Sequence, residues 1–360
     1  MRVLRIDGRS PYNTIVGVGG IGSGIFFALE GNHTLGRNES RAGALLPSRD
    51  YCKLHIVLHY VATLLGAGKS RVRVVPIGKV GDDENGHHLC QEMADAGMDV
   101  SCVGFVAGQP TLFSVCFQYP DGEGGNLTTN NSAASVLSHE EIDSCAAGLF
   151  AAAAKQTIAL AVPEVPLEVR SHFLERATAA GAYRAASFLA GEIAGARDAG
   201  MLALLDLVSL NTSEAAELVG GHFSWTNSSE FVNACLRFLK GEFPRLSMIV
   251  TVGRHGAFAF AGQEYAHCPA PRVQVASTAG AGDALLGGVI AAIAGGVPLL
   301  KPGASMGPLA SALDFGVLLA SYKCQSPHTI HTSCSLEELV KFAGSKGWRF
   351  GATLQELMEI

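Results

Sequence analysis

The chain has 360 residues, 48% hydrophobic and 16% charged, so it can bury a large core and is too apolar to be disordered. A formal net charge of −6 without a polybasic run excludes a basic surface for nucleic acid. The first residues lack the apolar core of a signal peptide, and the longest apolar runs are shorter than the roughly 20 residues that cross a bilayer. We expect a cytoplasmic protein that has neither a nucleic-acid nor a membrane partner.

In the first third of the chain, β-rich runs alternate with amphipathic stretches. A buried strand is predicted at 13–20, and we expect the glycine-rich segment 23–43 after it to be a flexible pocket loop. A helix follows at 50–68, then a strand at 71–81 and a second helix that stops at Gly97.

From residue 111 onward the pattern first changes and then resumes. Residues 111–129 are predicted to form two adjacent strands joined by an Asp/Gly-rich turn. The alternation then continues with strands at 156–162, 204–211 and 247–253 and with helices at 167–181, 213–220 and 229–241. Such alternation predicts a mostly parallel sheet covered on both faces, and the early antiparallel pieces predict a small lid on it.

One stretch matches the sequence pattern of a dinucleotide-binding motif but not the structural context that the motif requires. Gly17, Gly19 and Gly22 satisfy GxGxxG after the first strand. That motif requires the third glycine to open a long helix, but four more glycines follow without a helical period. A dehydrogenase is therefore not favoured.

Four stretches, taken in order, carry a family resemblance. Residues 78–100, 206–220, 248–260 and 276–288 resemble the motifs of the ribokinase-like carbohydrate kinases, the PfkB family, at about the family's spacing. The resemblance covers roughly residues 14 to 345. It implies a three-layer α/β fold with a mostly parallel central sheet, helices on both faces and a small β-rich lid. We expect one kinase domain over 1–360, with the lid formed from parts of about 14–50 and 105–130.

The stretch "GAGD" at 280–283 is the strongest of these motifs. By resemblance, Gly280, Ala281 and Gly282 form an anion hole for the transferred phosphoryl group, and Asp283 is the base that accepts the proton of the substrate hydroxyl. A glycine-built helix N-terminus has the anion affinity that this role needs. The alternative is that Asp283 is only a helix-start residue favoured by the helix dipole.

Two further motifs match the family's nucleotide-binding elements. Asn211 and Glu214 match its NxxE element, which organises the triphosphate of ATP and binds Mg²⁺ through water. Thr251, Gly253 and Gly256 match the loop that runs under the nucleotide. The alternatives are a helix cap at the first motif and ordinary turn glycines at the second.

The chain also departs from the family pattern at three places. Ser277 stands where the family usually has an acidic residue that forms a potassium site in potassium-activated members, which puts activation by potassium in doubt. The segment 20–24 lacks the usual sugar-binding aspartate. The family's GGxxxN element aligns with the residues from Cys52, so its glycines are missing too. The substrate pocket is therefore unusual.

Other polar residues near these departures are candidates for binding the substrate. The candidates in the pocket are Ser23, Asp50, Lys53 and Glu164, and the loop before them carries Arg37, Glu39 and Arg41. Cationic side chains there could bind a carboxylate or phosphate on the substrate. They could equally form a solvated face or a subunit contact, and Glu164 could be a surface residue at a helix entry. His328, His331 and Cys334 have the spacing of zinc ligands without an evident fourth one, so a structural loop is favoured.

Together these features predict an ATP- and Mg²⁺-dependent phosphotransferase that acts on an alcohol group of a sugar or sugar-like small molecule. A nucleoside or a vitamin-like alcohol is an alternative acceptor. A noncatalytic ligand-binding relative is an alternative of another class, although an intact "GAGD" turn argues against it. The strands at 111–129 could also pair with a second copy through an exposed edge, which makes a homodimer plausible.

Overall fold

The central feature of the computed structural model, which describes residues 3–4, 12–120, 124–301 and 309–358, is a nine-stranded sheet. Its strand order is β13-β12-β11-β10-β9-β8-β1-β4-β5. The seven strands from β11 to β5 in this order pair parallel, whereas β12 pairs antiparallel with both β11 and β13. The strands are β1 (Thr14–Val18), β4 (Arg73–Gly81), β5 (Val103–Val106), β8 (Thr157–Ala161), β9 (Tyr183–Ser187), β10 (Leu207–Asn211), β11 (Ser247–Thr251), β12 (Ala257–Ala261) and β13 (Glu264–Cys268).

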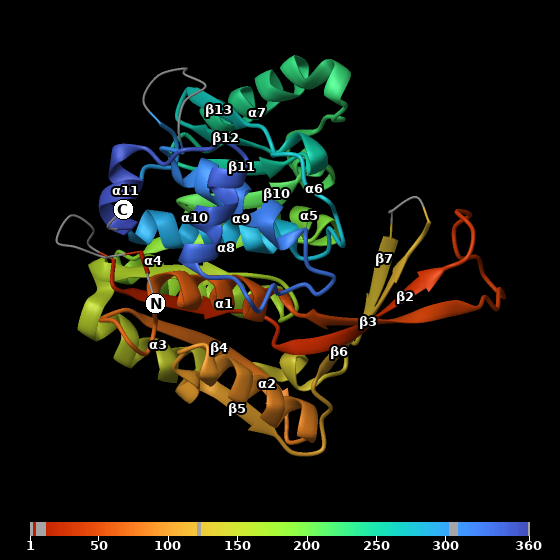
Figure 1. The fold of residues 1–360 in the computed structure, drawn as a ribbon. Helices are drawn as coiled ribbons and strands as arrows, with labels where there is room; N and C mark the ends of the chain where they lie inside the picture. Colours follow the sequence, from red (N-terminus) through yellow and green to blue (C-terminus); the bar gives the residue numbers. More distant parts are fainter. Residues whose placement is uncertain (1–2, 5–11, 121–123, 302–308, 359–360) are drawn as a thin grey trace.

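Helices cover both faces of this sheet and enclose two apolar cores (Figure 1). One core contains side chains of α1 (Lys53–Leu65), α2 (Glu84–Asp95), α8 (Ala281–Ala294), α9 (Ala312–Lys323), α10 (Leu336–Ser345) and α11 (Ala352–Met358). The other contains side chains of α3 (His139–Ala153), α4 (Leu167–Ala180), α5 (Ile193–Asp198), α6 (Thr212–Val219) and α7 (Ser228–Glu242). This confirms the predicted three-layer α/β fold.

Four more strands form a separate small sheet, which Figure 1 shows projecting from the body. They are β2 (Gly22–Leu29), β3 (Gly43–Tyr51), β6 (Leu112–Gln118) and β7 (Gly124–Thr128), in the order β3-β2-β6-β7. β2 pairs antiparallel with β3 and parallel with β6. We call this sheet the lid. The prediction of a loop over 23–43 is corrected in part: residues 23–29 belong to β2 and residue 43 begins β3, and the loop is confined to residues 30–42.

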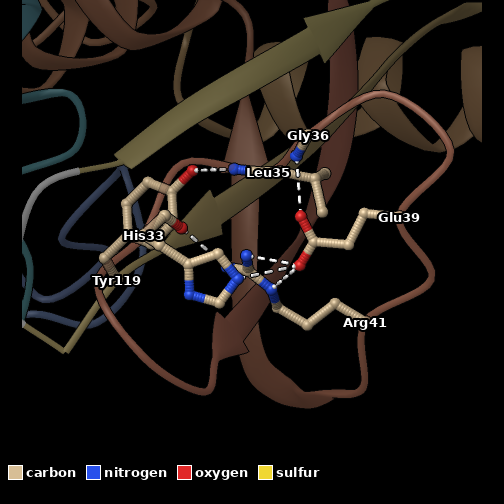
Figure 2. Close-up of polar contacts among 6 residues, drawn as sticks. All are labelled: His33, Leu35, Gly36, Glu39, Arg41 and Tyr119. Carbon is tan, nitrogen blue, oxygen red and sulfur yellow. Dashed lines mark hydrogen bonds and ion pairs between the residues drawn. The ribbon is translucent and has the colours of Figure 1, made fainter.

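The loop between β2 and β3, at the tip of the lid, is held by one carboxylate (Figure 2). Glu39 accepts hydrogen bonds from the backbone N–H of Gly36 at 2.7 Å and from Arg41 Nε at 2.6 Å, and it contacts His33 Nε2 at 3.1 Å. The Gly36 amide, followed by Arg41, lowers the pKa of Glu39 to about 2. Glu39 and Arg41 therefore order the lid tip, and neither lines the cleft described below.

Local signals explain where the principal helices begin and end. α1 ends at Gly66, whose φ of 65° is the left-handed conformation that glycine adopts readily. α2 begins after Asp83, whose side chain accepts the N–H of Gly86 at 2.7 Å. Within the described part of the chain, no helix is both long and apolar enough to cross a membrane.

Candidate active site

A cleft of about 1480 Å³ lies between the lid and the sheet edge where the parallel strands end. Each of four neighbouring strands is followed by a residue that lines it, because the carboxyl ends of parallel strands meet at one edge. These residues are Glu164 after β8, Glu192 after β9, Asn211 and Glu214 at the end of β10, and Gly253 with Arg254 after β11. The lid contributes Phe26, Asp50, Ser114, Cys116 and Asn126.

The N-terminus of α8 opens into this cleft through a glycine turn. Gly280 has a φ of 74°, and a Cβ there would lie 2.8 Å from the carbonyl oxygen of Thr329, so this position needs glycine. The Ala281 N–H donates to the Thr278 carbonyl at 3.1 Å. Among the described residues, the next two amides, those of Gly282 and Asp283, have no hydrogen-bond acceptor. N–H groups without an acceptor at a helix N-terminus are able to bind an anion.

The side chains of Lys53 and Asp283 meet in the cleft from the first turns of two different helices. Lys53 Nζ lies 3.6 Å from Asp283 Oδ1, and the two side chains are 29% and 14% exposed. The Asp283 carboxylate is the largest cause that raises the pKa of Lys53, so this side chain is a permanent cation. The Lys53 side chain therefore lies in the cleft and not on an outer solvated face.

Glu164 lines the cleft and has a strained backbone conformation. Its φ is 79°, which is unusual for a residue with a side chain and typical of functional sites. Its Oε2 accepts the backbone N–H of Lys53 at 3.0 Å. Burial raises the pKa of Glu164 to about 7, and the Lys53 ammonium opposes this rise. A Cβ on Gly20 would lie 2.7 Å from Oε2, so the absence of a side chain at residue 20 makes room for Glu164.

Asp50, the penultimate residue of lid strand β3, is a second carboxylate that lines the cleft. It is 9% exposed and accepts a hydrogen bond from Ser114 Oγ at 2.5 Å, while Cys116 Sγ lies 3.3 Å from the same oxygen. A Cβ on Gly24 would lie 2.9 Å from that oxygen and closer still to Ser114. The glycines that replace the expected aspartate thus accommodate carboxylates that come from β3 and from the β8–α4 loop.

Asn211 and Glu214 form a reciprocal cap at the start of α6. The Asn211 side chain accepts the Glu214 N–H at 2.9 Å, and the Glu214 carboxylate accepts the Asn211 N–H at 2.7 Å. Burial raises the pKa of Glu214. Both residues also line the cleft, so the capping alternative holds and leaves a role toward a nucleotide open.

Five predicted site residues are not among those that line the cleft: Ala281 and Gly282 in the first turn of α8, and Ser23, Thr251 and Gly256. Ser23 is buried, and its hydroxyl donates to Asn85 Oδ1 at 2.9 Å. Thr251 pairs with Asn211 across the sheet, outside the cleft lining. Gly256 has a φ of 94°, and a side chain there would overlap the carbonyl of Cys268, so the turn into β12 needs this glycine.

The His/Cys segment after α9 has a structural role. His328 Nδ1 accepts the Arg49 N–H at 3.0 Å, and His331 stacks on Tyr322 with ring centroids 4.5 Å apart. The Tyr51 N–H donates to Thr329 Oγ1 at 2.9 Å. The segment thus connects lid strand β3 to the body. Within the described ranges, no group of three or more His, Cys, Asp or Glu side chains could hold a metal ion.

Sequence reasoning missed several residues of the cleft. Arg254 stands between the two glycines of the "GRHG" turn, where a cation beside a proposed phosphate site could have been noticed. Ser114 and Glu192 carry no comparable signal, because only the folded chain brings the lid strand and the β9–α5 loop to the same cleft.

Comparisons with known proteins agree with this geometry. A fructokinase of Klebsiella pneumoniae is 30% identical over 231 residues, which are 62% of this chain and 72% of that protein. A ribokinase of Cryptococcus neoformans, solved with ADP, matches with a TM-score of 0.71 at 16% identity over 92% of this chain and 99% of that one. A nucleoside kinase of Burkholderia thailandensis, solved with inosine, matches with a TM-score of 0.68 at 16% identity over 93% and 99%.

The fold and its cleft define the class, that of the ribokinase-like α/β kinases. The model of the pfkB family of carbohydrate kinases matches residues 59–335. The chain belongs to this family, and it is therefore a carbohydrate kinase.

Proposed function

We propose that the protein transfers the γ-phosphoryl group of ATP to a hydroxyl group of a neutral, sugar-like acceptor, with Asp283 as the general base. One observation carries the proposal: the Asp283 carboxylate and the Lys53 ammonium meet in the cleft, at a helix start where the amides of Gly282 and Asp283 have no acceptor among the described residues. This arrangement supplies a proton acceptor and positive electrostatic potential at the same place, which in-line phosphoryl transfer requires.

The Asp283 carboxylate would take the proton of the acceptor hydroxyl as that oxygen attacks phosphorus. The two N–H groups at the start of α8 would stabilise the negative charge on the transferred group, since the helix backbone already fixes their position. Lys53 Nζ, 3.6 Å from Asp283, would hold the carboxylate in place and attract the phosphate oxygens.

The nucleotide side of the cleft fits a magnesium-bound triphosphate. A Cβ on Gly282 would meet no atom within 4 Å, so the turn leaves open space above it. Arg254 supplies a cation, and Glu214 and Asn211 supply oxygen ligands for the water shell of Mg²⁺. When bound, Mg²⁺ neutralises charge on the phosphates. A set of carboxylates too sparse to hold the ion alone is usual for Mg²⁺, which is bound mainly by phosphates and water.

The acceptor side favours hydroxyl groups over an anion. Asp50 and Glu164 offer carboxylate oxygens, which accept hydrogen bonds from hydroxyl groups. The positive charge of Lys53 is already shared with the carboxylates of Asp283, Glu164 and Glu214. An acceptor with a carboxylate or phosphate would therefore meet a surface with more negative than positive groups.

A nucleoside acceptor has one observation of its own in its favour. The lid places Phe26 and Phe117 in the cleft lining, where aromatic rings could stack on a flat base. The nucleoside kinase with the same fold was solved with inosine. A sugar and a nucleoside share the hydroxylated ring that Asp50 and Glu164 would contact.

The test is ATP turnover with D-fructose, D-ribose, inosine and a sugar acid, in the wild type and in Asp283→Asn. We expect turnover with a neutral acceptor and a kcat of Asp283→Asn that is about 10²- to 10⁴-fold lower, since the variant keeps shape but loses the proton acceptor. ATP affinity and melting temperature should hardly change. Glu338→Gln, a helix-start carboxylate of α10, is the matched control and should keep full activity. Normal turnover by folded Asp283→Asn would refute the mechanism.

A further inference from the structure

The turn before α8 is docked on the C-terminal end of α9. The Cys324 carbonyl accepts the N–H groups of Ala276 at 2.8 Å and of Ser277 at 3.3 Å. Lys323, the last residue of α9, donates from Nζ to the Ser277 carbonyl at 3.1 Å. These three hydrogen bonds fix the backbone six to seven residues before Asp283.

Lys323 is an unusual residue for this place because its side chain is wholly buried, with 0% of its surface exposed. Removing an ammonium group from water costs several kcal/mol unless it is paired, and an apolar side chain of similar volume is often as stable. Burial lowers the pKa of Lys323 to about 8. A group that folding alone would not favour points to a role at the turn that it contacts.

Several charged or titratable groups face this ammonium. They are the Cys324 thiol next to it, the carboxylates of Asp283 on α8 and Asp50 on β3, and the His331 imidazole on the following loop. The two carboxylates and the thiol oppose the effect of burial on Lys323. Burial and the Lys323 charge keep the pKa of His331 low, so this ring is neutral. Lys323 is therefore the cation beneath the turn.

We propose that Lys323 is a positioning residue: its ammonium is a tethered cation that holds the Ser277 carbonyl and thereby aims the Gly282 and Asp283 amides at the transferred group. This inference rests on the proposed function of the turn. It also explains why residue 277 is a serine and not an acidic residue. A carboxylate that binds a free cation is not needed where the chain supplies its own cation. A free monovalent cation would then be redundant.

The test compares Lys323→Met with Lys301→Met, which removes a lysine beside the opposite end of α9, where Nζ contacts Asp314 at 3.7 Å. The assay uses ATP, Mg²⁺ and the best of D-fructose, D-ribose and inosine. We expect Lys323→Met to fold and its kcat to fall by about 10²-fold, as for a small misplacement of reacting groups. The KM of the acceptor should stay, and Lys301→Met should behave as the wild type.

A pH profile separates positioning from mere packing. The ammonium is protonated below its pKa, so the kcat of the wild type should fall as pH rises through about 8, and Lys323→Met should lack this alkaline limb. Wild-type kcat in folded Lys323→Met, or a lowered kcat with the limb retained, would overturn the inference.

If Lys323→Met does not fold, measurements on the wild type still test the inference. A kcat without an alkaline limb near pH 8, or a large stimulation when potassium replaces sodium, would refute the tethered cation, and the opposite results support it. A wild type that phosphorylates none of the acceptors would instead refute the proposed function, and the inference would fall with it.

Discussion

Lys53 is the residue whose role the structure changes most. As a predicted substrate contact it would bind an anionic group, but its Nζ lies 3.6 Å from Asp283 and its charge is shared with two further carboxylates. We therefore expect Lys53 to act on the transfer step and not only on binding. Its effect should therefore appear in kcat.

Replacing Lys53 with methionine removes the ammonium and keeps an unbranched side chain. We expect kcat to fall at least about tenfold, because the charge is most valuable when negative charge develops on the transferred group. Steady-state kinetics measure kcat and the KM of each substrate separately. Lys341→Met, at a 62% exposed position of α10, is the control and should be silent. A raised acceptor KM with unchanged kcat would return Lys53 to a pure binding role.

At the scale of single residues, the motif around Asp283 predicts a base beside an anion-binding turn, since a carboxylate behind a glycine turn at a helix start has few other uses. The polar residues that would contact the acceptor were harder to predict. Asp50 and Ser23 are both polar residues near the first strand, and only the pairing of β2 with β3 turns Asp50 toward Ser114 while Ser23 contacts Asn85. That register is a long-range property of the fold.

At the scale of elements, the contact between the β1–β2 turn and the β8–α4 loop sets the position of Glu164. Gly20→Ala would place a methyl group 2.7 Å from Glu164 Oε2 and nearer to its Cβ, so the loop must shift. We expect a loss of about 1 to 3 kcal/mol in unfolding free energy and a raised acceptor KM. Thermal melts and kinetics measure both.

Gly148→Ala is the matched control for that change. A Cβ on Gly148, within α3, meets no atom within 4 Å. Alanine in a helix is favoured over glycine by up to about 1 kcal/mol, so this variant should be slightly more stable and fully active. A Gly20→Ala protein with the stability and KM of the wild type would show that residue 20 does not constrain Glu164.

The alternating elements were predictable because each strand and helix carries its own period of apolar residues. β1, α1, β10 and β11 lie within their predicted ranges. Strands β2 and β3 were not predictable, because their segment is rich in glycine and its side chains are only partly buried. Their stability comes from pairing with each other and with β6. Local sequence carries little information about such pairing.

Glu164 should make the free energy of unfolding of the whole protein depend on pH. Burial raises its pKa to about 7 from an ordinary value of 4.5, so the folded state binds the proton more tightly than the unfolded state. The contribution of Glu164 to the free energy of unfolding is therefore largest below about pH 4.5 and is lost as pH rises to about 7. Glu164→Gln should match the wild type at pH 4 and exceed it at pH 8, by no more than about 3 kcal/mol.

Glu39 provides a control of the opposite sign, since hydrogen bonds lower its pKa to about 2. Its contribution is present above about pH 4.5 and is lost as pH falls toward 2, so Glu39→Gln should be less stable than the wild type at pH 8. Denaturant unfolding at several pH values gives both differences. Equal pH dependence in Glu164→Gln and the wild type would contradict the buried carboxylate.

The division of the cleft between two sheets has a consequence for how such an enzyme diversifies. The proposed transfer groups, Lys53 and Asp283, stand on α1 and α8, which are packed into the main core, whereas Asp50, Ser114, Cys116 and the two phenylalanines belong to the lid. Substitutions in the two lid hairpins can therefore alter which alcohol is accepted while the chemistry is inherited unchanged. We therefore expect a change of substrate range to need few mutations, which would fall where the main core is not disturbed.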